Sequence, residues 1–261
     1  MTGPFSASDA VLFDLDGTLY RLAPMRRRML FELMRWGAAH PLTFPRLMSC
    51  LREFRSAREE LRGFADPDRA LADVQYEVPA ERLGVPPEEL RSMVEEWMFK
   101  RPLPFLAGAA WPGLREVLLQ LKASGVRLGV FSDYAPESKL EALGVRDLFD
   151  VALAATDREV NRFKPDPRGF ILGAERLGAA PGSTVYVGDR ADVDGVGGAY
   201  LHGPVGSGKT ALMWAQTRDS AEAIEALTNL LLDHGVTGPL RARARGSRTR
   251  CVHASHTLAP H

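Results

Sequence analysis

Cysteine is scarce in this chain of 261 residues, which contains only Cys50 and Cys251. The two residues are far apart, and their spacing matches neither a disulfide framework nor a zinc site, which favours a reducing compartment. No positively charged and then apolar leader precedes Val11, so we expect no secretory signal peptide. The sequence therefore predicts a cytoplasmic protein.

Net charge and long apolar runs are also lacking. The chain carries 33 basic and 33 acidic residues and its pI is about 7.0, so no overall field attracts nucleic acid or a membrane surface. Even the apolar stretch 29–51 is interrupted by charged residues and prolines, whereas a membrane span needs about 20 consecutive apolar residues. We expect neither a nucleic-acid partner nor a membrane partner.

Lysine is scarce as well, because the basic residues are mostly arginine. It occurs only at Lys100, Lys122, Lys139, Lys164 and Lys209. A lysine among so many arginines indicates a position that needs a compact ammonium group rather than a planar guanidinium group. Two of these lysines lie in segments of a kind that binds phosphate.

Two carboxylates follow an apolar run near the N-terminus. The sequence at 11–18 is VLFDLDGT, and its apolar part predicts a buried strand. Side chains two apart on an extended chain point to the same side, so Asp14 and Asp16 can converge on one ligand. Gly17 then permits a tight turn. For this segment alone, an ordinary Asp-Gly turn after a core strand is the alternative.

Three further segments end in polar side chains. Apolar strands are predicted at 126–133 and 184–189, and a helix at 170–177 follows a proline-rich turn. Helical segments such as 114–122 lie between the strands, which is typical of an open, parallel α/β sheet. Ligands of such sheets bind beyond the carboxyl ends of the strands, so these side chains are expected to meet there: Ser132, Asp133, Lys164, Asp189, Asp192 and Asp194.

These residue types suit phosphoryl transfer. Hard carboxylate oxygens suit Mg²⁺, and four aspartates offer them: Asp14, Asp16, Asp189 and Asp194. Ser132 can donate a hydrogen bond, and Lys164 can place a positive charge, where negative charge accumulates on the phosphoryl oxygens. One carboxylate remains as nucleophile, and a neighbouring aspartate can carry the proton.

The four segments resemble the four motifs of the haloacid-dehalogenase-like (HAD) hydrolases. The residues that carry the resemblance are Asp14-x-Asp16-Gly17-Thr18, Ser132, Lys164-Pro165-Asp166 and Gly188-Asp189-x4-Asp194. The resemblance covers 10–19 and roughly 103–194. It implies a Rossmann-like parallel sheet core with a helical cap inserted after the first strand.

The resemblance also implies a role for each residue. Asp14 is the nucleophile that forms an aspartyl-phosphate, and Asp16 is the general acid and base, whose backbone carbonyl also binds Mg²⁺. Asp189 is a metal ligand, supported by Asp194 directly or through water. The catalytic set is Asp14, Asp16, Ser132 and Lys164, and the substrate-binding set is Gly17, Thr18, Ser132, Asp133 and Lys164.

The second carboxylate of the first motif distinguishes among activities. Dehalogenases that resemble this chain lack it, since their leaving halide needs no proton, whereas Asp16 is present here. We predict a Mg²⁺-dependent phosphatase that acts on a small phosphorylated metabolite. A phosphomutase uses the same four motifs and stays an alternative.

The chain divides into three parts by its sequence pattern. Segments 1–20 and 105–235 form the predicted α/β core, and 21–104, with apolar residues at helical spacing, forms the predicted cap. The basic segment 236–261 lacks a core pattern and is expected to be a disordered tail.

The early part of the cap is rich in arginine. Most of these side chains are expected on a solvated helix surface. Arg21 and Arg26 lie nearest the first-motif turn and are the favoured candidates to bind an anionic group of the substrate. Methionine positions such as Met34 are expected in the cap core.

Three features depart from the family pattern. Asp133 stands where Asn or Gly is frequent, and its carboxylate is expected to cap a helix beginning near Pro136. Arg190 stands where a small polar residue is frequent; it can contact the substrate or pair with a surface acid, and the surface pair is the favoured interpretation. A glycine-rich segment at 195–198 replaces the helix that normally follows the fourth motif.

The segment GPVGSGKT at 203–210 matches the P-loop of nucleotide-binding ATPases. Lys209 lies in this segment. A helix is predicted at 221–232. A nucleotide-binding or regulatory protein on a HAD scaffold is therefore a second alternative. A working ATPase needs more chain than follows this segment, so a glycine-rich surface loop is the favoured interpretation.

Overall fold

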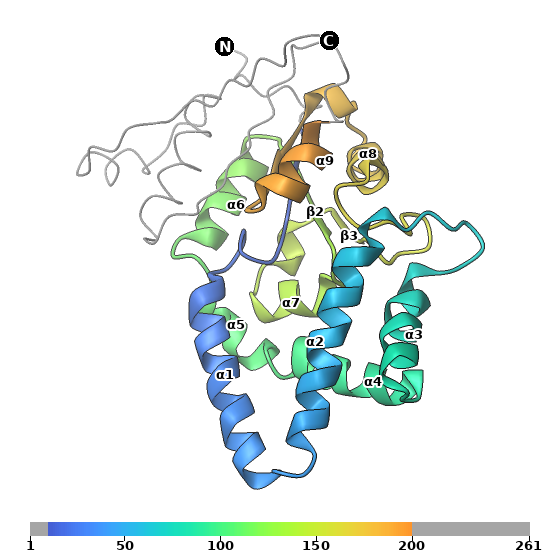
Figure 1. Cartoon of the computed structure of the whole chain (residues 1–261). Coiled ribbons are helices and arrows are strands. Elements are labelled where there is room, and N and C mark those ends of the chain that lie inside the picture. Colours follow the sequence, from blue (N-terminus) through green and yellow to red (C-terminus); the bar gives the residue numbers. More distant parts are fainter. Residues whose placement is uncertain (1–9, 200–261) are drawn as a thin grey trace.

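The computed structural model is described over residues 10–199. Three predicted features lie outside these residues: the P-loop-like segment 203–210, the helix expected at 221–232 and the tail at 236–261. Within residues 10–199 the chain forms a parallel sheet between helices, with a helical insertion after the first strand (Figure 1). The α/β fold class predicted from the sequence is confirmed.

The sheet contains four parallel strands within the described residues, in the order β3-β2-β1-β4. Phe13 in β1 pairs with Val130 in β2 and with Val187 in β4. This register brings the residues that follow β1, β2 and β4 to one edge of the sheet. The strands are Ala10–Phe13 (β1), Arg127–Ser132 (β2), Val151–Ala154 (β3) and Thr184–Val187 (β4).

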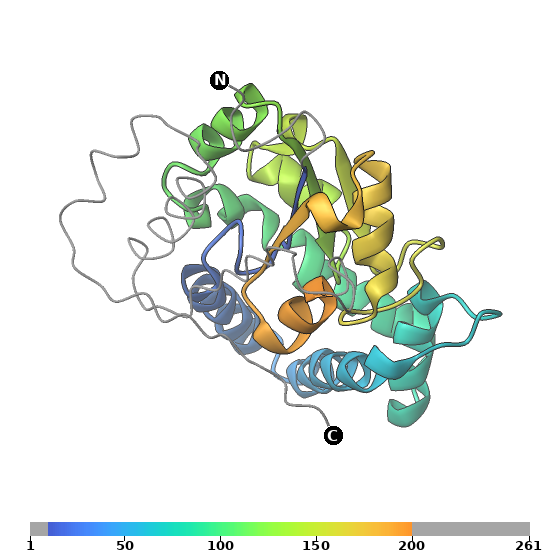
Figure 2. The same cartoon turned by 90° about the horizontal axis from the view of Figure 1, so that it is seen from above.

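Helices cover both faces of the sheet, with α6 and α8 on opposite sides of the strands (Figure 2). Side chains alternate along β1, so Val11 and Phe13 pack in one apolar cluster with α6 and α7, while Ala10 and Leu12 pack in another with α8. The helical segments are α6 (Leu114–Ala123), α7 (Glu137–Ala142), η3 (Arg146–Leu148), α8 (Pro167–Arg176), η4 (Pro181–Ser183), η5 (Ala191–Gly195) and α9 (Val196–Ala199).

Helix α8 begins where the sequence carries a start signal. Asp166 is its N-cap and accepts a hydrogen bond from the Arg168 N–H at 2.9 Å, while Pro167 occupies the first position. A Cβ at residue 169 would lie 2.0 Å from the Phe131 ring, so Gly169 allows the helix to lie close to the sheet. This packing fixes the start of α8 and the loop before it.

The insertion between β1 and β2 has an apolar cluster of its own, which includes Phe54, Tyr76, Leu90 and Trp97. Helix α1 runs away from the sheet and α2 returns toward it (Figure 1). No helix between residues 10 and 199 combines the length and apolar character that a membrane crossing requires. The inserted helices are α1 (Leu22–Ala39), α2 (Phe44–Glu60), η1 (Leu61–Gly63), α3 (Leu71–Leu83), α4 (Pro87–Val94), η2 (Glu95–Lys100) and α5 (Leu103–Ala109).

Two sequence expectations about helices are wrong. Met34, expected in the cap core, is 61% exposed on α1. Its neighbour Leu33 packs against the cap cluster, and one residue along a helix turns the side chain by about 100°. The glycine-rich segment 195–198 is helical rather than a loop. A Cβ at Gly197 would lie 2.2 Å from the Phe170 ring, so close packing explains the glycine.

Candidate active site

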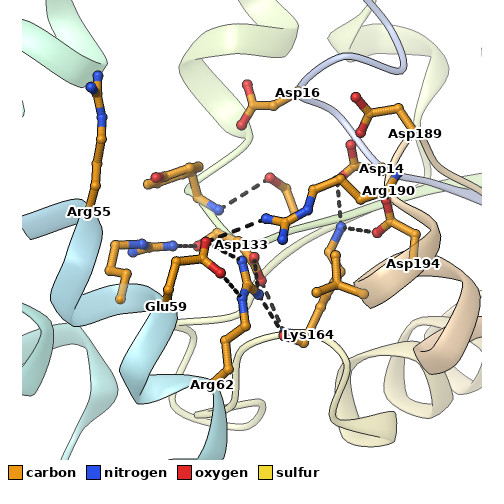
Figure 3. Close-up of a pocket in the computed structure, with 14 residues that line it drawn as sticks. Asp14, Asp16, Arg55, Glu59, Arg62, Asp133, Lys164, Asp189, Arg190 and Asp194 are labelled. Atoms are coloured by element: carbon orange, nitrogen blue, oxygen red, sulfur yellow. Dashed lines mark hydrogen bonds and ion pairs between the residues drawn. The ribbon is translucent and has the colours of Figure 1, made fainter. Parts of the chain in front are cut away.

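The carboxyl ends of β1, β2 and β4 border a pocket of about 230 Å³ (Figure 3). Asp14 directly follows β1, and its N–H donates to the Val187 carbonyl at 2.7 Å, which continues the pairing with β4. The predicted site residues that line the pocket are Asp14, Asp16, Ser132, Asp133, Lys164, Asp189 and Asp194. The structure thus brings side chains from all four motifs to one place.

A buried lysine joins two of these acids. Lys164 follows β3 in the chain, and its Nζ donates to Asp14 Oδ1 and, at 2.8 Å, to Asp194 Oδ1. The ammonium also donates to the Tyr186 hydroxyl at 2.8 Å, and that hydroxyl donates to Asp194 Oδ1 at 3.1 Å. A buried charge without a partner costs several kcal/mol. The contacts among Lys164, Asp14, Asp194 and Tyr186 therefore hold these side chains in place. No sequence signal distinguishes Tyr186, which lies in the apolar strand β4.

Three carboxylates at this edge lie close enough to share one cation. Asp14, Asp189 and Asp194 each place an oxygen within 4.8 Å of the others. Burial raises the pKa of Asp14 above its ordinary value, and nearby carboxylates add to this, while Lys164 opposes it. Burial and the charge of Asp194 raise the pKa of Asp189 to about 6. Hard oxygen donors with this excess of negative charge fit Mg²⁺.

The turn after β1 packs against the same acids. Gly17 has a φ of 103°, and a Cβ there would lie 2.1 Å from Asp189 Oδ2, so both backbone conformation and close approach require glycine. Thr18 Oγ1 donates to Asp14 Oδ2 at 3.2 Å. Gly17 and Thr18, predicted to bind substrate, contact the acids but are not among the described residues that line the pocket.

The second carboxylate of the first motif has other partners. Lys139 Nζ donates to Asp16 Oδ1 at 2.6 Å and to Oδ2 at 2.8 Å, and the Tyr20 hydroxyl also donates to Oδ1. Burial alone would raise the pKa of Asp16, but the Lys139 charge and these hydrogen bonds lower it. These contacts therefore favour the ionised form of Asp16, which is the form that accepts a proton. Sequence reasoning noted Lys139 only as one of few lysines and missed this contact.

Asp133 does not cap α7, so that expectation is wrong. The N-cap of α7 is Pro136, and no side chain caps it. Asp133 Oδ1 instead accepts the Lys164 backbone N–H at 3.1 Å, and Oδ2 accepts Arg62 Nη1 at 2.9 Å. A hydrogen bond from a guanidinium to a carboxylate is stronger than one from a neutral helix N–H, which favours this arrangement.

Arginines from the end of α2 and from η1 approach the pocket. Arg58, only 5% exposed, donates to the Asp133 carbonyl at 2.7 Å and lies 4.0 Å from the Tyr134 ring centroid. Arg62 Nη1 also donates to the Lys164 carbonyl at 2.6 Å. The cap therefore contacts the loop that follows Ser132 and the loop that carries Lys164.

The expectation that Arg21 and Arg26 face the substrate is wrong. Neither belongs to the described residues that line the pocket, whereas Arg55, Arg58 and Arg62 do. Arg21 Nη2 instead donates to the Gly108 carbonyl at 3.4 Å. Proximity in sequence to the first motif does not place these side chains at the pocket, because α1 leads away from the sheet (Figure 1).

Arg190 pairs with acids, as expected. Its Nη2 lies 2.6 Å from Asp192 Oδ2, and its Nη1 lies 3.4 Å from Glu59 Oε1 in the cap. The side chain also lines the pocket, opposite α2 (Figure 3). Arg190 therefore links the fourth motif to the cap through Glu59.

Comparisons with known proteins point to one family. The family model of haloacid dehalogenase-like hydrolases matches residues 8–202. Glyceraldehyde 3-phosphate phosphatase of Methanopyrus kandleri is 29% identical over 192 residues, 71% of this chain and 77% of the relative. Validoxylamine A 7'-phosphate phosphatase of Streptomyces hygroscopicus subsp. limoneus is 33% identical over 184 residues, 68% of this chain and 75% of the relative.

A solved structure shares the fold. L-2-haloacid dehalogenase from Xanthobacter autotrophicus superimposes with a TM-score of 0.51 at 19% identity, covering 90% of this chain and 87% of the other. At this identity the likeness extends to the fold alone. The choice between the reactions in this fold therefore depends on the pocket residues.

Proposed function

The chain belongs to the haloacid dehalogenase-like hydrolases, and from this premise we propose that it is a Mg²⁺-dependent phosphatase of a small phosphomonoester. The observation that carries the proposal is the cluster of Asp14, Lys164, Asp189 and Asp194 at the strand ends, beside a second first-motif carboxylate, Asp16. Asp14, Lys164 and Asp194 are buried, and Asp189 is half-buried. A leaving alkoxide needs a proton, which Asp16 can deliver, whereas a leaving halide does not.

In the first step, an oxygen of the Asp14 carboxylate attacks the phosphorus atom. The bond from phosphorus to the leaving oxygen breaks, and Asp16, which carries a proton at the start of this step, gives it to that oxygen, so that an alcohol leaves and an aspartyl-phosphate remains. Lys164 and Ser132 stabilise the negative charge on the phosphoryl oxygens in the transition state.

In the second step, water attacks the phosphorus atom of the aspartyl-phosphate. Asp16 takes a proton from that water, the bond from phosphorus to Asp14 breaks, and inorganic phosphate leaves. The proton on Asp16 then serves the next substrate. The ion pair with Lys139 favours the ionised form of Asp16, which is the form that accepts the proton here.

Mg²⁺, when bound, supplies positive charge that lets an anionic nucleophile approach an anionic phosphate. Asp14, Asp189 and Asp194 would hold it with their carboxylates, and Asp16 with its backbone carbonyl. These carboxylates fit because they are clustered, and because burial and neighbouring carboxylates raise the pKa of Asp14 and of Asp189.

The size of the substrate follows from the pocket. The pocket has a volume of about 230 Å³ and is lined in part by cap arginines, which suits a small metabolite. Relatives named for glyceraldehyde 3-phosphate and validoxylamine A 7'-phosphate support the same substrate class. We assign segment 21–104 to a cap and segments 1–20 and 105–235 to the core that it covers.

The test is phosphate release from a panel of small phosphomonoesters, with Mg²⁺ and with a chelator. We expect release that the chelator abolishes and that Asp14→Asn abolishes. Turnover that neither affects would contradict the proposal. An isomerised substrate without phosphate release would identify a phosphomutase instead.

A further inference from the structure

We infer that Lys139, together with Tyr20, is a positioning residue that holds Asp16 in place for proton transfer. The inference rests on the proposed function, because it gives Asp16 the role of proton carrier. It concerns residues outside the four motifs: Lys139 on helix α7 and Tyr20 both contact Asp16 of the first motif.

Two donors on different elements fix the Asp16 carboxylate. Lys139 Nζ contacts both oxygens, at 2.6 and 2.8 Å, so the ammonium restrains the rotation of the carboxylate about its last bond. Tyr20, which belongs to the turn after β1 and is 4% exposed, donates to Oδ1. The carboxylate is therefore held from two directions.

This ion pair differs from the surface pairs of the same structure. The Lys139 and Asp16 side chains are 9% and 22% exposed, whereas those of Lys122 and Asp150 are 33% and 43% exposed. Solvent screens the exposed pair, so it contributes little. A lysine buried beside a pocket costs desolvation, and its contact with Asp16 compensates for that cost.

Lys139 acts through Asp16 rather than on the substrate. Asp16 lines the pocket, but Lys139 and Tyr20 are not among the described residues that line it. Tyr134, which does line it, has its ring centroid 5.1 Å from Lys139 Nζ. The Lys139 ammonium therefore affects the reaction only through the position of the Asp16 carboxylate.

The consequence is a specific dependence on the leaving group. Asp16 must protonate the departing oxygen of an alkyl phosphate, whereas the oxygen of an activated aryl phosphate leaves without a proton. If Lys139 positions Asp16, its loss slows the first step for alkyl phosphates and spares it for aryl phosphates. A lysine that only supported the fold would affect both substrates equally.

The experiment compares first-turnover rates of an alkyl phosphate and of p-nitrophenyl phosphate by rapid quench with Mg²⁺. For Lys139→Met we expect the alkyl rate to fall about 100-fold and the aryl rate to stay within about threefold of wild type. Tyr20→Phe is expected to show the same pattern with a smaller loss. Lys122→Met, which removes the exposed pair with Asp150, is the matched control and should leave both rates unchanged.

The double variant Asp16→Asn/Lys139→Met sharpens the test. Because Lys139 acts through Asp16, adding Lys139→Met to Asp16→Asn should cause no further loss of the alkyl rate. Lys139→Gln retains an N–H donor, and it serves in place of Lys139→Met if circular dichroism shows that the methionine variant does not fold.

The outcomes separate this inference from the proposed function. Equal losses for both substrates in Lys139→Met or Lys139→Gln, or additive losses in the double variant, would overturn the positioning role. If Asp16→Asn itself showed no dependence on the leaving group, the proposed role of Asp16 would fail instead.

Discussion

The core wall and the cap wall of the pocket are both rich in charge, but they differ in how that charge is balanced. On the core wall, Lys164 faces three clustered carboxylates, which leaves an excess of negative charge. Where the cap meets the core, Arg62 of the cap and Arg190 of the core both pair with Glu59, and each has a second acidic partner. An excess of buried negative charge indicates where a cation binds and where the reaction takes place. The paired arginines and acids instead hold the cap against the core.

The depth of the two walls differs as well. Asp14, Lys164 and Asp194 have side chains no more than 8% exposed, while the Arg62 and Glu59 side chains are 17% and 56% exposed. Electrostatic effects grow as solvent is excluded, so substitutions on the core wall should cost far more activity than those on the cap wall.

The largest effect is expected for Asp14→Asn, which removes the nucleophile. Turnover should fall by at least on the order of 10⁴-fold, as in other enzymes that lose a covalent nucleophile. The measurement is phosphate release under saturating substrate. Asp192→Asn is the matched control, because Asp192 belongs to the fourth motif yet is 65% exposed and pairs with Arg190. Equal losses in both variants would remove the distinction between the walls.

Lys164→Met should have the next largest effect. Losing a charge that stabilises the transition state is expected to lower kcat by about 10² to 10³-fold. The variant also leaves Asp14 and Asp194 without their shared cation, which should destabilise the metal-free protein by about 3 to 5 kcal/mol. Denaturant unfolding with and without Mg²⁺ checks this, and added Mg²⁺ should restore part of the loss. Unchanged stability in the metal-free variant would contradict the charge imbalance.

Mg²⁺ itself should stabilise the wild-type protein. At a concentration about 100 times its Kd, a ligand that binds only the folded state adds about 2.7 kcal/mol. The measurement is Tm as a function of Mg²⁺ concentration, with Asp189→Asn as the variant in which the increase should shrink. A Tm that does not respond to Mg²⁺ in the wild type would argue against a metal site at the strand ends.

A smaller effect is expected on the cap wall. Asp133→Asn and Arg62→Met each break the pair that joins the cap to the Lys164 loop. We expect KM to rise by a few-fold and kcat to change little, with a coupling energy of about 1 kcal/mol in a double-mutant cycle. A loss of kcat as large as that of Lys164→Met would show that the pair acts on the reaction itself.

The smallest effect is expected for Arg21→Gln. This side chain contacts the Gly108 and Ala109 carbonyls rather than the pocket. Activity should stay within about twofold of wild type, since surface substitutions are usually within about 0.5 kcal/mol. A clear increase in KM would restore the sequence-based expectation that this arginine binds substrate.

The same contrast explains what the sequence could predict. Strand ends and motif residues follow from local patterns, so the parallel sheet and the meeting of Asp14, Ser132, Lys164 and Asp189 were predictable. Each of these residues lies within a few positions of the end of an apolar strand or of the proline where a helix begins. Their chemical roles are not determined by that placement and stay predictions.

Contacts between distant segments were not predictable. Lys139 meets Asp16 across 123 positions of sequence, and Arg62 meets Asp133 across 71. No local periodicity records which helix turn faces which loop, so the arginines of α2 could not be separated from Arg21 in advance. The glycines in 195–198 suggested a loop, but at Gly197 close packing against Phe170 requires glycine. The sequence alone does not distinguish these two reasons for a glycine.

The central claim is that Asp14 becomes phosphorylated, and trapping the intermediate tests it most directly. Asp16→Asn is mixed with p-nitrophenyl phosphate and Mg²⁺, quenched, and reduced with borohydride, which converts an aspartyl-phosphate to homoserine. Mass spectrometry of the tryptic peptide 1–21 is expected to place homoserine at position 14. A peptide without this change during turnover, or with the change at another residue, would contradict the account.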